Sequence, residues 1–247
     1  DMIMKSGYYD YPKIADNLAI TGGKFGSILE IGCGWGGVME EALLSGRSIT
    51  GLTLSTEQKA FAENRLQNIE AATSKPHFEV RLQDYRDCQE QFDGIASVEM
   101  FEAVGEKHWP EYFQTLANCL KSSGKACIQT IVIADHLFES YRHSTDFIQQ
   151  YVFPGGMLPS RDSFKAAAAK AGLQIENEFA FGADYAKTLC IWRDNFNQKL
   201  QEIRRLGFDE TFIRLWNFYL MYCAAGFSER NIDVVQFTLS HSSHKTS

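Results

Sequence analysis

The sequence lacks an excess of basic residues and any long apolar run. Its 247 residues include 24 Lys and Arg against 31 Asp and Glu, so the net charge is −7. This balance argues against nucleic-acid partners, and against attachment to an anionic membrane by net charge alone. No apolar run reaches the roughly 18 residues that span a bilayer, and the first residues do not resemble a secretory signal. We therefore expect a cytoplasmic protein, for which peripheral attachment to the inner face of the membrane stays open.

Closely spaced cysteines are also missing. The six cysteines are scattered, mostly inside apolar segments, and form no CxxC pair. This pattern is typical of reduced, buried thiols. Asp135, Glu139 and His143 share one helical face, but no second Cys/His cluster completes a metal site, so we predict a solvated polar face and no metal.

Low-complexity linkers and internal repeats are absent as well. With 45% hydrophobic residues, a chain of this length buries a substantial core. We therefore predict a single domain over 1–247, in which the small, polar residues 241–247 form a disordered tail.

What the chain does have is a glycine-dense turn directly after an apolar strand. Residues 28–37 read Ile-Leu-Glu-Ile-Gly-Cys-Gly-Trp-Gly-Gly. Glycines allow the backbone to approach a ligand closely, and the helix that follows presents unpaired N–H groups. Because Gly32, Gly34 and Gly37 also satisfy the G-x-G-x-x-G spacing, this turn predicts a nucleotide site for either NAD or S-adenosylmethionine (SAM).

The next strand favours SAM. A NAD site needs Asp or Glu about 20 residues beyond the glycines, whereas the predicted strand 48–54 ends in Thr53 and Leu54. Glu30 places a carboxylate beside the turn, where a cationic ligand is favoured. SAM carries a sulfonium and an ammonium group, whereas NAD carries a pyrophosphate.

Predicted strands and helices alternate through the first half of the chain. After the strand that ends at Ile31, we expect strands over 48–54, 77–82, 92–98 and 126–133, and helices that include 55–71 and 107–120. Such alternation indicates an α/β fold with a parallel, doubly wound sheet. Ligands bind beyond the carboxyl ends of such strands, so we expect one crevice to be formed by 32–37, Thr53, Asp84 and 99–102.

The second half is richer in helices and aromatic residues. Helices are predicted over 135–151, 163–171, 187–206 and 209–227, and strands over 173–181 and 232–239. We expect the helices within 135–165 and 187–227 to cap the crevice. Their aromatic residues either line an apolar tunnel for the substrate or fill the core, and the pattern alone favours the core.

Seven segments carry a more specific pattern. They read Leu-Glu-Ile-Gly-Cys-Gly-Trp-Gly-Gly (29–37), Gly-Leu-Thr-Leu-Ser-Thr-Glu-Gln (51–58), Gln-Asp-Tyr-Arg-Asp (83–87), Met-Phe-Glu-Ala-Val-Gly (100–105), Tyr-Val-Phe-Pro-Gly-Gly-Met-Leu-Pro-Ser (151–160), Phe-Gly-Ala-Asp-Tyr-Ala-Lys-Thr-Leu (181–189) and Ile-Asp-Val-Val-Gln-Phe (232–237). In this order they resemble the catalytic domain of the cyclopropane-fatty-acyl-phospholipid synthase family, which includes the mycolic acid cyclopropane synthases. The resemblance implies a Rossmann-like, seven-stranded class I methyltransferase sheet with the helical cap over its carboxyl-end edge. It also implies a SAM-dependent methyltransferase of lipid biosynthesis, which converts the cis double bond of an unsaturated phospholipid acyl chain at the membrane surface into a cyclopropane.

The resemblance assigns residues to each part of SAM. The methionine moiety lies at Gly32 and Gly34. The ribose and then the adenine lie against residues that follow the second and third strands, namely Thr53, Leu54, Gln58, Asp84 and Tyr85.

The chemistry that the resemblance implies requires a proton acceptor. Methyl transfer to an alkene leaves a carbocation, which needs electron-rich neighbours and then loss of a proton. In the family a bound bicarbonate takes this proton, held by a Glu, a His, a Tyr, a Cys and backbone groups. Here Glu102 matches the Glu, Tyr185 matches the Tyr, and Ile131 matches the position that offers its backbone.

Two departures from the family pattern affect this catalytic set. Gln129 stands at the His position, and a Gln amide donates to an anion but cannot carry positive charge. Bicarbonate would then be held more weakly, by neutral donors. The family's Cys lies upstream of the matching segments, so we expect 1–25 to supply only part of the N-terminal lid. Whether the protein lacks the rest or the sequence is a piece of a longer chain is open.

The sequence leaves several functional readings open. Plain methylation or methylenation could replace ring closure, because the deprotonating site is the altered part. A methyltransferase of a soluble small molecule, a degenerate SAM- or lipid-binding module and, last, a NAD oxidoreductase are further interpretations. A homodimer is one possible oligomeric state.

Overall fold

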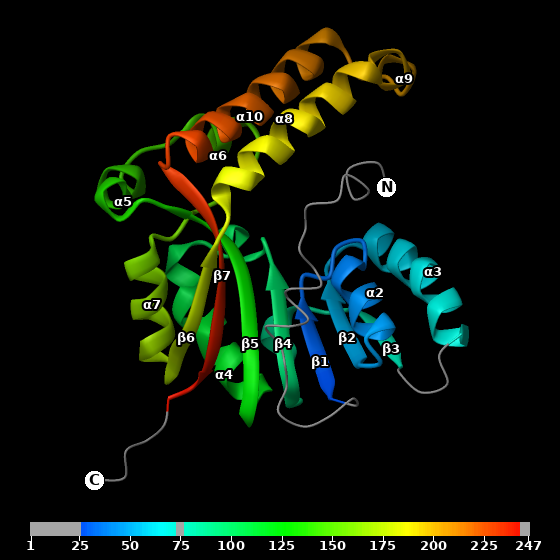
Figure 1. Ribbon diagram of the computed structural model, residues 1–247, viewed down its shortest axis with the longest axis vertical. Helices are drawn as coiled ribbons and strands as arrows, with labels where there is room; N and C mark the ends of the chain where they lie inside the picture. The colour runs from blue at the N-terminus through cyan, green and yellow to red at the C-terminus, as the bar shows by residue number, and fades with distance from the viewer. Residues whose placement is uncertain (1–25, 73–76, 243–247) are drawn as a thin grey trace.

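The computed structural model describes residues 26–72 and 77–242, and Figure 1 shows one sheet flanked and capped by helices. The strands are β1 (Ser27–Ile31), β2 (Ser48–Thr53), β3 (Phe78–Leu82), β4 (Phe92–Val98), β5 (Leu120–Ile133), β6 (Leu173–Ala180) and β7 (Ile232–His241). The helices are α2 (Gly37–Leu44), α3 (Thr56–Ala72), α4 (Trp109–Cys119), α5 (Asp135–Arg142), α6 (Phe147–Tyr151), α7 (Arg161–Lys170), α8 (Gly182–Gln198), α9 (Leu200–Arg205) and α10 (Glu210–Ser228). Short 3-10 turns are η2 (Tyr85–Asp87), η3 (Phe101–Ala103) and η4 (Glu106–His108).

The seven strands lie in the order β3-β2-β1-β4-β5-β7-β6. Strands β1 to β5 pair in parallel, as predicted, but β7 runs antiparallel to both β5 and β6. The start of β7 pairs with the end of β5, where Ile232 lies opposite Ile133. The chain therefore enters β7 from the carboxyl-end edge of the sheet, directly after α10, and this entry fixes the reversed direction. The seven-stranded methyltransferase fold is confirmed, and the sheet is mixed rather than wholly parallel.

Helices cover both faces of the sheet. Alternate residues of a strand point to opposite faces, so Ile28 packs with α2 and α3 while Leu29 packs in the larger core against α4 and α7. A third apolar cluster joins α8 and α10 to β7. Figure 1 shows α8 and α10 as a long antiparallel pair that extends beyond the carboxyl-end edge.

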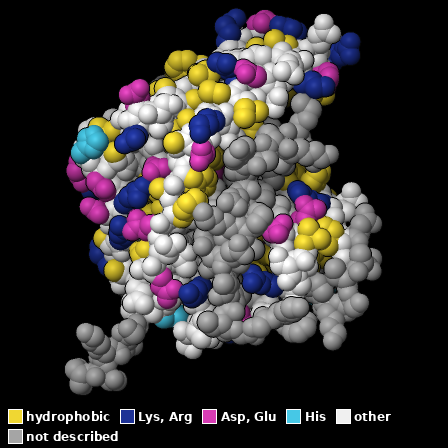
Figure 2. All heavy atoms as spheres, in the orientation of Figure 1, with side chains coloured by type: hydrophobic (Ala, Val, Ile, Leu, Met, Phe, Trp, Pro, Cys, Tyr) yellow, Lys and Arg dark blue, Asp and Glu magenta, His cyan; other side chains and the backbone are white. Residues whose placement is uncertain are grey.

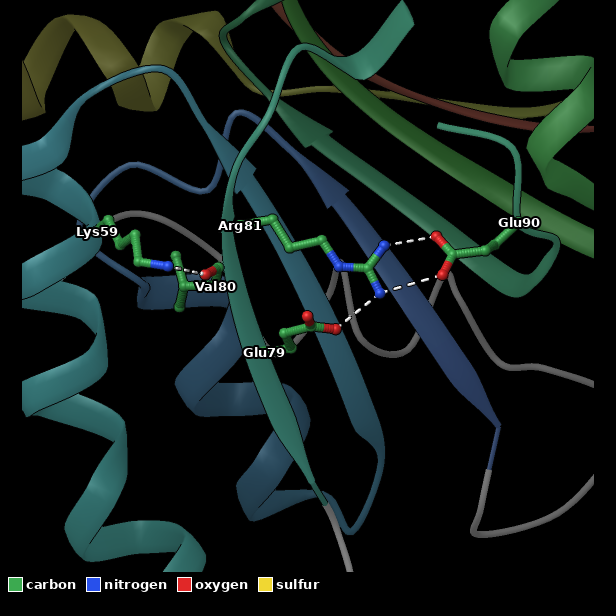
Figure 3. Close-up of polar contacts among 5 residues, drawn as sticks. All are labelled: Lys59, Glu79, Val80, Arg81 and Glu90. Atoms are coloured by element: carbon green, nitrogen blue, oxygen red, sulfur yellow. Dashed lines mark hydrogen bonds and ion pairs between the residues drawn. The ribbon is translucent and has the colours of Figure 1, made fainter. Parts of the chain in front are cut away.

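Ion pairs fix the edge strand β3. Figure 3 shows Arg81 between Glu79 and Glu90, while Lys59 on α3 donates to the Val80 carbonyl at 2.8 Å. These contacts tie β3 to α3 and to the segment after η2. They therefore hold the two ends of the loop that carries residues 83–88.

Two predicted helices are divided in the structure. The 135–151 segment forms α5 and α6, because Asp146 caps a new helix through a reciprocal capping box with Gln149. The 187–206 segment belongs to α8 and α9, and α8 begins earlier, at Gly182. Within the described ranges no helix is long and apolar enough to cross a membrane. His241 is the last residue of β7, whereas the predicted lid 1–25 and residues 243–247 lie outside the described part of the chain.

Candidate functional site

A cavity of about 420 Å³ opens at the carboxyl ends of β1, β2 and β3. Six of the eight residues predicted for the nucleotide line it, whereas Glu30 and Gly34 do not. Those that line it are Gly32, Thr53, Leu54, Gln58, Asp84 and Tyr85, together with Met100, Ala103, Val104 and His108 from the segment after β4. We refer to this space as the nucleotide cavity.

The glycine turn brings the bare backbone of Gly32 to this cavity, whereas Gly34 is not among the lining residues. Gly32 adopts φ +77°, and a Cβ there would lie 2.8 Å from Met100 Cγ. Gly34 also has positive φ, +51°, but a Cβ there would meet nothing within 4 Å. Gly32 is therefore required by packing, whereas the open space at Gly34 is available to a ligand.

Glu30 lies beneath the turn and is not among the residues that line the nucleotide cavity. It is 2% exposed, and burial raises its pKa well above the usual range despite a hydrogen bond from the Met39 backbone on α2. A neutral Glu30 would link the turn to the start of α2. Its attraction for a cationic ligand stays a prediction.

The polar residues of the nucleotide cavity are held in place by local bonds. Thr53 Oγ1 donates to Gln58 Oε1 at 2.8 Å, and Ser55 Oγ accepts from the Gln58 backbone N–H at 3.2 Å as the predicted cap of α3. The side chain and backbone N–H of Arg86 both donate to Asp84, which holds the pKa of Asp84 below its usual range. Asp84 is therefore an ionised acceptor at neutral pH.

A second cavity, of about 440 Å³, lies under the cap. We call it the apolar cavity, because most of its wall is hydrocarbon. Its lining includes Ile131, Ile148, Val152, Phe153, Met157, Leu158 and Tyr219 together with the acids Glu99, Glu102 and Asp146. The described residues that line it include no Lys, Arg or His.

The segment after β4 separates the two cavities. Glu99 and Glu102 line the apolar cavity, whereas Met100 and Val104 line the nucleotide cavity. Ala103 lines both. A ligand in one cavity can therefore approach a ligand in the other beside Ala103.

The Glu102 carboxyl group is enclosed, although the residue as a whole is only half-buried. Its Oε1 accepts from the Ile131 backbone N–H at 2.6 Å, while its buried Oε2 has no hydrogen-bond partner among the described residues. Desolvation, and then the charge of Glu99, raise the pKa of Glu102 to about 8. Glu102 is therefore mostly protonated at neutral pH.

Glu99 is a candidate functional residue that the sequence did not single out. Tyr185 Oη donates to Glu99 Oε2 at 3.0 Å, and Gln129 Nε2 donates to Glu99 Oε1 at 3.0 Å. The amide of Gln129 in turn accepts from Gln236 Nε2 at 3.0 Å. The sequence placed residues 99–102 at the crevice, but nothing local distinguishes Glu99 from a solvated acid.

A bicarbonate ion does not fit the donors that the resemblance assigns to it. Gln129 and Tyr185 both donate to Glu99, and the Ile131 N–H donates to Glu102. Each predicted donor is thus engaged by a carboxyl group of the protein. A further anion would also lie beside Glu99, and like charges repel.

The aromatic residues of the cap divide between core and cavity. Trp192, Phe196, Phe212 and Trp216 belong to the packing of α8 and α10, as the pattern favoured. Tyr219 and Phe153 line the apolar cavity instead, and Phe153 is 55% exposed, so the cavity reaches the surface.

A surface aromatic cluster, made of Phe147, Tyr151, Phe218 and Tyr222, lies on α6 and α10. The Phe147 ring lies 4.6 Å from that of Phe218 and 5.9 Å from that of Tyr222. Tyr151 and Phe218 are each more than half exposed. Figure 2 shows hydrophobic side chains gathered on this upper part of the molecule.

Comparison with known proteins agrees with this geometry. Residues 7–237 match the family model described as mycolic acid cyclopropane synthetase. The chain is 41% identical over 229 residues to tuberculostearic acid methyltransferase UfaA1 of Mycobacterium tuberculosis. This match covers 92% of the chain and 53% of that protein. It is 35% identical over 214 residues to cyclopropane-fatty-acyl-phospholipid synthase of Escherichia coli, covering 86% of the chain and 53% of the relative. The chain therefore spans about half the length of these curated relatives.

A solved structure is also similar. The crystal structure of mycolic acid cyclopropane synthase CmaA1, complexed with SAH and CTAB, superposes with a TM-score of 0.81 at 26% identity. The superposition covers 93% of this chain and 82% of that one.

Proposed function

The chain belongs to the mycolic acid cyclopropane synthetase family, and from this premise we propose that it transfers a methyl group from SAM to the cis double bond of an unsaturated phospholipid acyl chain. The observation that carries the proposal is the pair of cavities that meet at Ala103. One suits a nucleoside donor, and the other suits a hydrocarbon acceptor. A single segment, 99–104, lies between them.

The nucleotide cavity fits SAM by the chemistry of its lining. SAM, when bound, supplies an electrophilic methyl group on a positively charged sulfur. Thr53 and Gln58 would hold the ribose, Asp84 and Tyr85 would lie at the adenine, and the open backbone at Gly34 would receive the methionine moiety. The similar structure that contains SAH, the demethylated form of SAM, supports this assignment.

The apolar cavity suits a reaction that builds positive charge on a hydrocarbon. The π electrons of the double bond form the new C–C bond, and the neighbouring carbon becomes cationic. Glu99 and Asp146 would supply negative charge beside that carbon in a cavity whose wall is mostly hydrocarbon, where electrostatic stabilisation is strong. The rings of Tyr141 and Tyr219 add aromatic faces, which also attract cations.

The surface aromatic cluster supports access from a lipid surface. Aromatic side chains with a polar edge favour the membrane–water interface, and Phe153, which lines the apolar cavity, is 55% exposed. We propose that the acyl chain enters there from a membrane. The net charge of the chain would not attract it to an anionic membrane, because that charge is −7.

The product is either a cyclopropane or a methylene-branched acyl chain. Ring closure follows if the new methyl group loses its proton at once. An exocyclic methylene follows if a 1,2-hydride shift comes first. The family resemblance favours the ring, whereas the 41% identity to a tuberculostearic acid methyltransferase favours the branched product.

The apolar cavity favours a lipid methyltransferase over a soluble-substrate enzyme and over a binding module. A soluble polar substrate would leave the hydrocarbon wall of the apolar cavity without a partner. A degenerate binding module would not need acids placed at the meeting point of the two cavities.

Vesicles of cis-unsaturated phosphatidylglycerol, incubated with the chain and SAM, test the proposal. We expect mass spectrometry to detect a gain of one methylene unit in the acyl chains, and none with saturated vesicles. Proton NMR then separates the ring, whose protons resonate far upfield, from the alkene protons of a methylene. If SAM binds and no acyl chain gains mass, the binding-module interpretation replaces ours.

A further inference from the structure

The carboxylate of Glu99 engages two of the donors that the resemblance assigns to bicarbonate. Tyr185 and Gln129 each donate to one of its oxygens at 3.0 Å. We propose that Glu99 removes the proton from the transferred methyl group, so that the reaction proceeds without a bicarbonate ion. This inference rests on the proposed function and names its proton acceptor.

The backbone of Glu99 is consistent with a functional constraint. Glu99 has φ +50°, one of two non-glycine residues with positive φ in the described chain. For an L-residue with a long side chain, this conformation costs on the order of 1 kcal/mol, and glycine would adopt it without strain. The backbone N–H of Glu99 donates to the Gln129 carbonyl at 2.8 Å, which holds the conformation in place. A strained residue that persists in a cavity wall indicates a use for its side chain.

Gln236 orients the donor that holds Glu99. Gln236 and Gln129 are both fully buried on paired strands, opposite each other in the β5–β7 register. Because Gln236 Nε2 donates to Gln129 Oε1, the amide nitrogen of Gln129 must face Glu99. We therefore identify Gln236 as a positioning residue, which acts on Glu99 through Gln129.

Glu99 retains the capacity to accept a proton. Tyr185 and Gln129 both donate to its oxygens, as they would to an ionised carboxylate, which is an acceptor only. Glu99 also lines the apolar cavity, where the methyl group would arrive.

The step balances without a further reactant. A C–H bond of the new methyl group breaks, and its proton passes to a Glu99 carboxylate oxygen. The electron pair of that bond closes the three-membered ring, or forms the exocyclic double bond after a hydride shift. The proton is later released to water, and neither an oxidant nor a reductant takes part.

Bicarbonate dependence of the wild-type chain is the first test. Product formation from cis-unsaturated vesicles is measured in buffer freed of carbon dioxide and again with added bicarbonate. We expect the two rates to agree within about twofold. A rate that rises severalfold with bicarbonate overturns the role of Glu99. Absence of product under both conditions contradicts the proposed function itself, and the inference falls with it.

Glu99→Gln is the second test, because it keeps the size of the side chain and removes the base. Positioned bases contribute roughly 10²–10⁴-fold to rates, so we expect a loss of that order, with SAM affinity by calorimetry unchanged. Glu139→Gln on α5 is the matched control, since that side chain is exposed, and it should retain wild-type activity. A Glu99→Gln chain that binds SAM and keeps its activity overturns the proposal. If this variant does not fold, the bicarbonate measurement on the wild type still decides.

Gln236→Leu tests the positioning role. We expect kcat to fall roughly tenfold while KM for SAM stays unchanged, because Gln236 lies outside both cavities. If Gln236 has only a structural role, the substitution lowers the fraction of folded chain but leaves kcat unchanged when it is calculated per SAM-binding molecule. That result would overturn the assignment of Gln236.

Discussion

The backbone N–H of Ile131 donates to the carboxyl group of Glu102 across 2.6 Å and joins β5 to the turn after β4. The second oxygen of Glu102 is buried without a hydrogen-bond partner among the described residues. Burial and the charge of Glu99 outweigh the bond from Ile131, which by itself lowers the pKa of Glu102, and they keep the acid in the wall of the apolar cavity in its neutral form. A neutral acid beside the charged Glu99 avoids placing two negative charges in one desolvated site.

Glu102 makes the stability of the chain depend on pH. Its pKa of about 8 in the folded chain lies above the ordinary value of 4.5, so the folded state binds the proton more tightly. Stability therefore decreases as pH rises between these two values, by up to about 1.4 kcal/mol per pH unit. We expect Glu102→Gln, which keeps the oxygen that accepts from Ile131, to remove this part of the slope. Urea unfolding at pH 5.5 and pH 7.5 measures the difference, and parallel losses in both proteins would contradict it.

Backbone strain at Glu99 predicts a difference between two truncations. Glu99→Ala and Glu99→Gly delete the same carboxylate, but only glycine accepts φ +50° without strain. We expect the Gly variant to be more stable than the Ala variant by about 1 kcal/mol. Thermal melting of the two proteins provides the comparison. Equal midpoints would mean that the backbone relaxes when the side chain is removed.

The two glycines of the turn should respond differently to alanine. Gly32→Ala places Cβ 2.8 Å from Met100 Cγ at φ +77°, so we expect a loss of stability of a few kcal/mol. Gly34→Ala meets no neighbouring atom, so its cost in stability should be about 1 kcal/mol. Its main effect should be on the ligand, with SAM affinity reduced at least roughly tenfold, which is about 1.4 kcal/mol. Calorimetric titration with SAM checks the second point, and unchanged affinity would place the methionine moiety elsewhere.

Filling the apolar cavity should separate the two ligands. Val152→Trp enlarges a side chain in the cavity wall, and we expect at least a tenfold loss of activity on vesicles. SAM affinity should not change, because Val152 does not line the nucleotide cavity. Ile191→Trp on α8 is a suitable control, since Ile191 is 43% exposed and lines neither cavity. Full activity of Val152→Trp would mean that the acyl chain lies outside this space.

Local signals explain how much of the fold was predictable. The strand that ends at Ile31, the glycine turn and the Ser55 cap of α3 depend on residues close in sequence, and their positions are confirmed within one or two residues. The division of 135–151 into α5 and α6 also has a local cause, the cap at Asp146, which the helical period concealed. The direction of β7 could not be predicted, because it depends on where α10 ends relative to β5.

The candidate site was predictable for the nucleotide and less so for the proton acceptor. Thr53 and Asp84 follow strands whose carboxyl ends meet at one edge, a rule that a sequence can apply. Glu99 gains its role from Gln129, 30 residues away, and from Tyr185, 86 residues away. No pattern around Glu99 reports on partners at such separations.

The position of β7 between β5 and β6 has a consequence for the order of folding. Gln236 comes from this strand, although its bond to Gln129 reaches across 107 residues. Until β7 is inserted, β5 presents an open edge and β6 lacks its partner strand, and open edges invite pairing with another chain. Nearly all of the described polypeptide must therefore be synthesised before Gln236 can orient Gln129 toward Glu99. The proposed support for Glu99 and the covering of the β5 edge thus arrive together, when β7 joins the sheet.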